Sequence, residues 1–242
     1  MEQRKKQSVF RFQQFSIRQD RCAMKVGTDG VLLGAWAQWE NEPGAILDIG
    51  AGTGLLALML AQRSETETID ALEIDVAAFE QCVDNFEASP WANRLFCYHV
   101  SLQEFMEEVY EQYDLIVSNP PFFSETVSSG SEGRDHARQN SSLPFDYLLQ
   151  GISRLLLPDG VFHTIVPYRE EVHFLDLARS YSLYPGRITR VRGNPTAPLK
   201  RSLLELSFRN GNPEIGELVI EKARHVYTRE YRELTTGFYL DF

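Results

Sequence analysis

Short apolar runs alternate with helix-length segments through the middle of this 242-residue chain. The segments between the runs carry apolar positions at three- and four-residue spacing, as amphipathic helices do. Strands that alternate with helices are typical of a parallel sheet with helices on both faces. The sequence therefore predicts an α/β protein built on a doubly wound, mostly parallel sheet. The five predicted strands of this part cover residues 45–50, 68–75, 94–100, 113–119 and 161–167.

The C-terminal part has a different pattern. The runs "RITRVRG" (187–193) and "RSLLELSFR" (201–209) are strand-like and have no helix between them. They predict an antiparallel pair that closes one edge and brings the sheet to seven strands. Residues 1–44, with a helix expected after Asp29, are interpreted as a short N-terminal extension of a core at 45–242. A single domain spanning 1–242 is expected.

Composition and charge narrow the class of protein. The chain has no apolar run near the roughly 20 residues that span a bilayer, and no apolar stretch of signal-peptide length follows its basic N-terminus. Three cysteines without metal-like spacing favour a reducing cytoplasm and no metal. The net charge is −10, yet residues 179–209 hold seven Lys or Arg against Glu205 alone. Such a segment can form a positive face for nucleic acid; solvated strand faces are the alternative.

A glycine-rich turn follows the first predicted strand. "LDIGAGTGLL" places Gly50, Gly52 and Gly54 before a helix, where glycine lets the backbone turn tightly and approach a ligand. Asp48 precedes the turn, and Glu73 ends the next strand, where an acid can accept hydrogen bonds from ribose hydroxyls. The spacing differs from the dinucleotide fingerprint. The combination predicts a nucleoside-binding site.

A second motif, Asn119-Pro120-Pro121-Phe122, follows the fourth predicted strand. In a doubly wound sheet, this position faces the same crevice as the glycine turn. The Asn119 side-chain oxygen and the Pro120 carbonyl can each accept an N–H of a planar amine, and Phe122 can stack on a base. These three residues are the predicted catalytic group. A conformational turn is the alternative.

The two motifs resemble those of a known family. "ILDIGAGTG" looks like the first motif of class I S-adenosylmethionine-dependent methyltransferases, and "NPPF" is similar to the catalytic motif of members that methylate an amino group in a planar π-system. The resemblance implies a Rossmann-like fold and S-adenosylmethionine as cofactor. More narrowly, the chain resembles bacterial enzymes that methylate N6 of adenine 37 in the anticodon loop of valine tRNA. Residues 10–36, "EGRDHAR" (132–138) and the tail at 227–240 carry this closer likeness, which covers nearly the whole chain.

The resemblance also implies which residues meet each ligand. Lys25, Thr28 and Asp29 are expected to close over the methionine end of the cofactor, with a helix cap by Asp29 as the alternative. Where the family often has an acid that contacts the adenine of the cofactor, this chain has Ser101, followed by Leu102. The full set predicted for the cofactor is Asp48, Gly50, Gly52, Gly54, Glu73, Ser101, Leu102, Asn119, Lys25 and Thr28. The residues predicted to contact RNA are Arg134, His136, Arg138, Lys200 and Arg201.

Several alternatives stay open from the sequence. The same motif suits a protein glutamine amide or a guanine amino group of ribosomal RNA as acceptor. An NAD-dependent oxidoreductase is disfavoured by the glycine spacing, and an RNA-binding module without activity would keep the fold. The expected partner is a tRNA anticodon stem-loop bound by a monomer.

Overall fold

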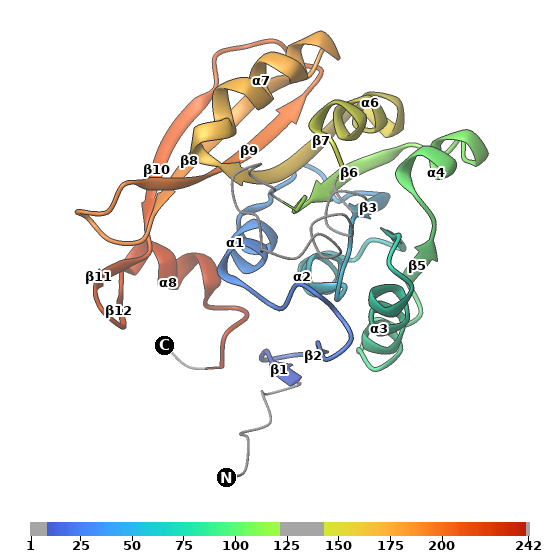
Figure 1. Cartoon of the computed structure of the whole chain (residues 1–242), viewed down its shortest axis with the longest axis horizontal. Coiled ribbons are helices and arrows are strands. Elements are labelled where there is room, and N and C mark those ends of the chain that lie inside the picture. Colours follow the sequence, from blue (N-terminus) through green and yellow to red (C-terminus); the bar gives the residue numbers. More distant parts are fainter. Residues whose placement is uncertain (1–8, 122–142, 241–242) are drawn as a thin grey trace, which may run out of the picture.

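The computed structural model describes residues 9–121 and 143–240. Its main sheet has eight strands in the order β10-β8-β9-β7-β6-β3-β4-β5, and β9 runs antiparallel to both of its neighbours, whereas all other pairs are parallel (Figure 1). The strands are β3 (Ala45–Ile49), β4 (Thr68–Glu73), β5 (Leu95–His99), β6 (Tyr113–Ser118), β7 (Leu156–Pro167), β8 (Tyr184–Arg192), β9 (Leu199–Ser207) and β10 (Glu214–Val219).

The α/β class, the parallel order and the antiparallel β8–β9 pair are confirmed. The sheet has one strand more than the seven predicted, because β10 pairs in parallel with β8 and becomes the edge beyond it. Only Leu218 of β10 is buried, so the strand lacks the apolar run by which the others are predicted. Strand β7 also begins earlier than predicted, with an irregularity in its pairing where Pro158-Asp159-Gly160 stands.

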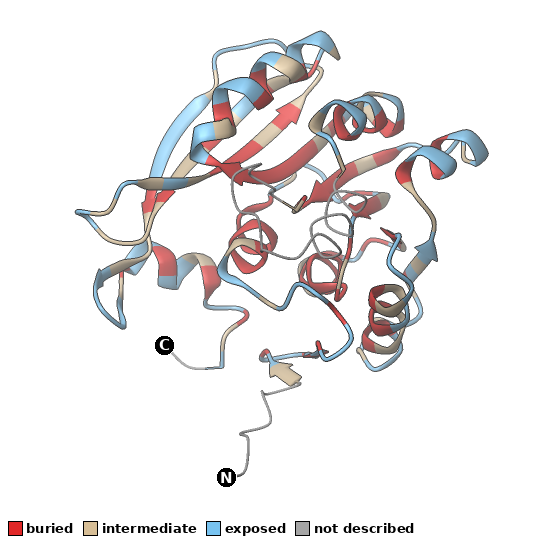
Figure 2. Ribbon diagram, in the orientation of Figure 1, coloured by how far each residue is buried: buried red, intermediate tan, exposed pale blue. Residues whose placement is uncertain are grey.

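Helices cover both faces of the sheet. Consecutive residues of β3 separate the two cores, since Ile46 belongs to one apolar cluster and Leu47 to the other. One face carries α1 (Thr28–Trp36), α2 (Leu55–Arg63), α3 (Val76–Glu87) and α8 (Arg229–Thr235). The other carries α4 (Leu102–Glu108), α6 (Phe145–Leu155) and α7 (Glu171–Ser180), which follows the short 3-10 helix η1 (Tyr168–Glu170). Figure 2 shows the buried central strands between them.

The two ends of the described chain lie together on the side of the sheet that carries α1 (Figure 1). One small hairpin is β1 (Val9–Arg11) with β2 (Ser16–Arg18), and another is β11 (Glu221–Ala223) with β12 (Val226–Tyr227). The N-terminal segment is joined to the C-terminal tail by the Gln13 amide, which donates to the carbonyls of Thr236 (2.8 Å) and Tyr239 (2.6 Å). Within residues 9–121 and 143–240, no helix is long and apolar enough to cross a membrane.

Candidate functional site

The strand order reverses between β3 and β6, which are neighbours in the sheet although the chain passes through β4 and β5 between them. Ligands bind outside the carboxyl ends of strands at such a switch point. Gly50 follows β3 and Asn119 follows β6 by one residue. Both line one cavity of about 340 Å³, together with Gly52, Lys25 and Thr28. The two motifs singled out in the sequence therefore face a common space.

The three glycines of the turn have positive φ angles of 75°, 57° and 78° in chain order. A Cβ built on Gly50 or Gly52 would meet no atom within 4 Å, so both backbones border open space. A Cβ on Gly54 would come within 2.5 Å of the Phe86 ring, where α2 packs against α3. The first two glycines thus leave room for a ligand, and the third is required by packing.

Glu73 at the end of β4 holds the glycine turn in place. Its Oε2 accepts a hydrogen bond from the Gly52 backbone N–H at 2.8 Å, and its Oε1 accepts one from the Asp75 backbone N–H at 2.9 Å. A carboxylate has about four acceptor positions, so each oxygen keeps one, but Glu73 is buried behind the turn and does not line the cavity.

Asp48 lies beneath the turn rather than on the cavity wall. Its side chain is fully buried, its Oδ2 accepts from the Ala57 backbone N–H at 3.2 Å, and its Oδ1 has no partner among the described residues. Burial raises the pKa of Asp48 from 3.8 to about 7, and the nearby Glu73 carboxylate acts in the same direction. Through its hydrogen bond to Ala57, Asp48 stabilises the start of α2. A positive charge placed nearby would lower its pKa.

Helix α1 covers the Asn119 side of the cavity. A Cβ on Gly30 would meet Leu55 at 2.9 Å and the Asn119 amide nitrogen at 3.8 Å, so glycine allows this close approach. Asn119 itself is half-buried and Pro120 is buried, whereas Lys25 and Thr28 are exposed at the cavity rim. Of Asn119 and Pro120, Asn119 lines the cavity, whereas Pro120 does not.

The start of α1 differs from the expected one. The helix begins at Thr28 with Gly27 as its N-cap, and no side chain caps it. The Asp29 carboxylate instead accepts a hydrogen bond from Arg201 Nε at 2.7 Å, which ties α1 to β9. Arg201, a predicted RNA contact, therefore has a carboxylate partner within the protein.

This pairing is general in the basic C-terminal segment. Every arginine in residues 179–209 forms an ion pair with a carboxylate, and only Lys200, which is exposed, forms none with a described residue. The positive face expected there is largely neutralised by internal partners. The paired arginines are Arg179, Arg187, Arg190, Arg192, Arg201 and Arg209.

Ser101 and Leu102 have structural roles at the start of α4. The Ser101 hydroxyl accepts from the Glu104 backbone N–H, and the Glu104 carboxylate accepts from the Ser101 backbone N–H, which forms a capping box. Leu102 is buried against Gly151 of α6, where a Cβ would lie 2.6 Å from it. Neither residue lines the cavity at the switch point.

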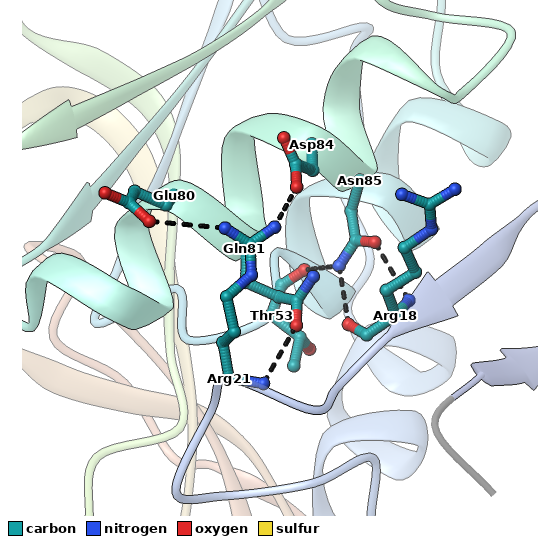
Figure 3. A network of polar contacts seen from close by, with 7 residues as sticks. All are labelled: Arg18, Arg21, Thr53, Glu80, Gln81, Asp84 and Asn85. Atoms are coloured by element: carbon teal, nitrogen blue, oxygen red, sulfur yellow. Dashed lines mark hydrogen bonds and ion pairs between the residues drawn. The ribbon is translucent and has the colours of Figure 1, made fainter.

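A polar network that the sequence analysis missed anchors the N-terminal segment to the glycine turn (Figure 3). The Asn85 amide nitrogen donates to the carbonyls of Arg18 and Thr53, both at 2.9 Å, while its oxygen accepts from the Arg18 backbone N–H. Gln81 accepts from the Arg21 backbone N–H, and the Arg21 guanidinium pairs with Glu80 and Asp84. Asn85 and Gln81 are buried polar residues of α3, and no local sequence pattern marks them as buried.

Four predicted residues lie outside the described ranges: Phe122, Arg134, His136 and Arg138. Their predicted contacts with substrate stay predictions. Among the described residues, no group of three or more His, Cys, Asp or Glu side chains could hold a metal ion.

Comparison with known sequences gives a consistent result. A family model described as the methyltransferase small domain matches residues 30–134. A protein of Flavobacterium psychrophilum named tRNA1(Val) (adenine(37)-N6)-methyltransferase is 57% identical over 232 residues, which are 96% of this chain and 99% of that protein. A protein of the same name from Christiangramia forsetii is 55% identical over 233 residues, which are 96% and 97% of the two chains.

Comparison with solved structures supports the fold. The crystal structure of a predicted O-methyltransferase from Agrobacterium tumefaciens superposes with a TM-score of 0.68 at 17% identity. The match covers 87% of this chain and 96% of that one.

Proposed function

Because this chain belongs to the family of tRNA1(Val) (adenine(37)-N6)-methyltransferases, we propose that it transfers a methyl group from S-adenosylmethionine to N6 of adenine 37 in valine tRNA. The observation that carries the proposal is the cavity at the switch point, which the glycine turn and Asn119 line together. A methyl donor and an amine acceptor must meet in one space, and this cavity joins the motif for each.

The residues present fit S-adenosylmethionine. When bound, this cofactor supplies a methyl group carried on a positively charged sulfur. Gly50 and Gly52 border open space that any side chain would fill, and each oxygen of Glu73 keeps an acceptor position. Lys25 and Thr28 stand at the rim, where a carboxylate of the ligand could be bound.

Asn119 and Pro120 orient the acceptor amine. The N6 amine of adenine is a weak nucleophile because its lone pair is delocalised into the ring. Hydrogen bonds from its two N–H groups to the Asn119 side-chain oxygen and the Pro120 carbonyl would draw the nitrogen toward tetrahedral geometry and localise that pair. Methyl transfer to this nitrogen would form the N–C bond as the S–C bond breaks, and the cationic nitrogen would then release a proton to water. In-line positioning of this kind can lower a barrier by about 7–11 kcal/mol.

The target adenine has to be unpaired to enter the cavity. An anticodon loop is single-stranded, so the cost of extracting the base is small, and Phe122 would stack on it. Lys200, Arg201, Arg134, His136 and Arg138 are proposed to bind the RNA backbone.

The same geometry would suit other planar amines, so the experiment must identify the product. Purified protein is incubated with labelled S-adenosylmethionine and with total RNA and protein from cells that lack the enzyme, and the tRNA, ribosomal RNA and protein fractions are analysed for label. Label in N6-methyladenosine at position 37 of valine tRNA is expected. Label in a protein glutamine or in a guanine of ribosomal RNA, with unlabelled tRNA, would replace the proposal by that acceptor.

Three further features complete the proposal. Residues 1–242 form one methyltransferase domain, supported by a core cluster that joins Phe12 and Phe238 to the strands of the sheet. The protein acts as a monomer. It works in the cytoplasm, where its tRNA substrate is present.

A further inference from the structure

A second cavity adjoins the one at the switch point. It measures about 550 Å³, and residues Val26, Gly27 and Thr28 line both cavities, so a single segment separates them. Both volumes lie in the range of sites that hold small molecules or parts of larger ligands. A ligand that fills the second cavity would stand directly beside the methyl-transfer site.

The wall of the second cavity is aromatic. Its rings come from Phe10 of the N-terminal hairpin and from Tyr227, Tyr231 and Tyr239 of the C-terminal tail. Tyr227 stacks on Tyr231 with centroids 5.2 Å apart and an interplanar angle of 30°, so the pair forms a rigid aromatic surface. Tyr227 and Phe10 are half-buried and keep part of their surface accessible, whereas Tyr231 is buried. Aromatic platforms of this kind stack unpaired bases in RNA-binding proteins.

Asn194 and Glu221 are among the polar side chains that line the cavity. The oxygen of the Asn194 side chain accepts hydrogen bonds from the Thr196 and Ala197 backbone N–H groups at 3.1 and 2.9 Å. This orientation leaves the amide nitrogen of Asn194 as a donor, since no described residue accepts from it. On Glu221, Oε1 accepts from the His225 backbone N–H at 3.3 Å, and Oε2 accepts from no described residue. The cavity therefore offers a donor and an acceptor, as the polar edge of a nucleobase requires.

Charged side chains of both signs flank the lining residues in the chain, since Glu221 lines the cavity and the exposed Glu230 precedes Tyr231. Arg11, Lys25, Lys222 and Arg232 each stand next to a lining residue in the chain, all four are exposed, and none forms an ion pair with another described residue. This contrasts with the six paired arginines of residues 179–209. Cations without internal partners remain available for phosphates.

We infer that the second cavity binds an unpaired nucleobase of the RNA substrate that flanks the target adenine. The inference rests on the proposed function and adds a subsite to it. The flanking base stacks on Tyr227, its polar edge meets Asn194 and Glu221, and the adjacent phosphates contact the surrounding cations. Splaying two neighbouring bases into two cavities on either side of Val26–Thr28 would present the adenine alone to Asn119.

The test uses synthetic anticodon stem-loops in which one loop nucleotide at a time is made abasic. With the wild-type enzyme, loss of one flanking base is expected to raise KM for the RNA about tenfold, as loss of an aromatic stacking contact does. Tyr227→Ala should raise KM about tenfold on the intact loop as well. If base and ring contact each other, the two changes combined should cost no more than either alone. If, at every loop position, the KM increases caused by the abasic nucleotide and by Tyr227→Ala multiply, the inference is overturned.

Two further variants separate stacking from folding. Tyr227→Phe keeps the ring and should retain the wild-type KM, and Tyr110→Ala removes a tyrosine that is 91% exposed and touches neither cavity. Both should bind S-adenosylmethionine and unfold thermally as the wild type does. A Tyr227→Ala enzyme with unchanged KM for RNA would refute the subsite while leaving the methyltransferase proposal intact. Absence of tRNA methylation by the wild type would instead refute the proposed function.

Discussion

The amide nitrogen of Asn85 lies 2.9 Å from the carbonyl oxygen of Thr53, and so helix α3 holds the turn that borders the cofactor cavity. The same amide group binds both backbone polar groups of Arg18. One buried side chain therefore couples the N-terminal segment to the glycine turn. Its removal would leave several backbone groups without partners.

Asn85→Ala should lower the free energy of unfolding by about 1–3 kcal/mol, the cost of leaving buried polar groups unsatisfied. It should also weaken binding of S-adenosylmethionine, because the turn loses its support. Chemical denaturation and calorimetry measure the two effects. Asn93→Ala, at an exposed asparagine, serves as the control. Equal behaviour of the two variants would contradict the role assigned to Asn85.

Asn119→Ala should reduce the rate of methyl transfer by about 100-fold, comparable to the loss of one polar group that stabilises a transition state. Binding of S-adenosylmethionine should persist, because the glycine turn and Glu73 are unchanged. Single-turnover kinetics and calorimetry on the same preparation separate the two. A variant with wild-type turnover would remove Asn119 from the mechanism.

Substitutions at two glycines of the turn should differ in their effect. Gly52→Ala adds a methyl group toward open space at a φ of 57°, so it should cost about 1–2 kcal/mol in strain and reduce affinity for the cofactor. Gly54→Ala places a Cβ 2.5 Å from Phe86 and should mainly lower the melting temperature. Measurement of cofactor affinity and thermal stability for both variants tests this; identical profiles would contradict it.

Asp48→Asn should change how stability depends on pH. The native pKa of Asp48 is raised to about 7 from 3.8, so between these values the folded state binds more protons than the unfolded state. The contribution of Asp48 to the free energy of unfolding therefore falls as pH rises through this window. Asn does not titrate. As pH rises through this window, the free energy of unfolding of the variant should therefore increase relative to that of the wild type by up to about 1.4 kcal/mol per pH unit. Urea unfolding at pH 5 and pH 8 measures the difference, and a difference that does not vary with pH would argue against a raised pKa.

Lys200→Ala should raise KM for tRNA a few-fold and make that KM less sensitive to salt, with a slope smaller by about 0.7, as expected for loss of one phosphate contact to a single strand. Arg154→Ala, on the exposed side of α6, removes a cation that also forms no ion pair with a described residue and should have neither effect. KM measured across a salt series compares them. A similar response of both variants would show that Lys200 does not contact the RNA.

The sequence predicts best where burial produces a pattern. The apolar runs of β3, β4 and β6 predict their strands within a residue or two, because parallel strands are covered on both faces. Strand β10 was not predicted, since its side chains are largely exposed and its pairing depends on the free edge of β8. The start of β7 was missed for a related reason: Pro158-Asp159-Gly160 has the composition of a turn, yet the chain continues through it as an irregular strand.

Within the site, the motifs were predictable and their supports were not. Asn119, Gly50 and Gly52 follow from position in the chain, because strand ends at a switch point converge. Arg18 and Asn85 are 67 positions apart in the sequence, and Asp29 and Arg201 are 172 positions apart. No local pattern links either pair. Arg201 illustrates the difficulty, since a run of basic residues does not reveal which carboxylates the fold brings to it.

The segment Val26–Thr28 forms a wall of both cavities. A ligand that displaced this wall from one side would alter the free energy of binding on the other side. Thermodynamic linkage makes such an effect reciprocal: if the methyl donor increases the affinity for RNA by some factor, RNA must increase the affinity for the donor by the same factor. With a base in one cavity and the donor in the other, three residues of backbone would be enough to couple the binding of the two substrates.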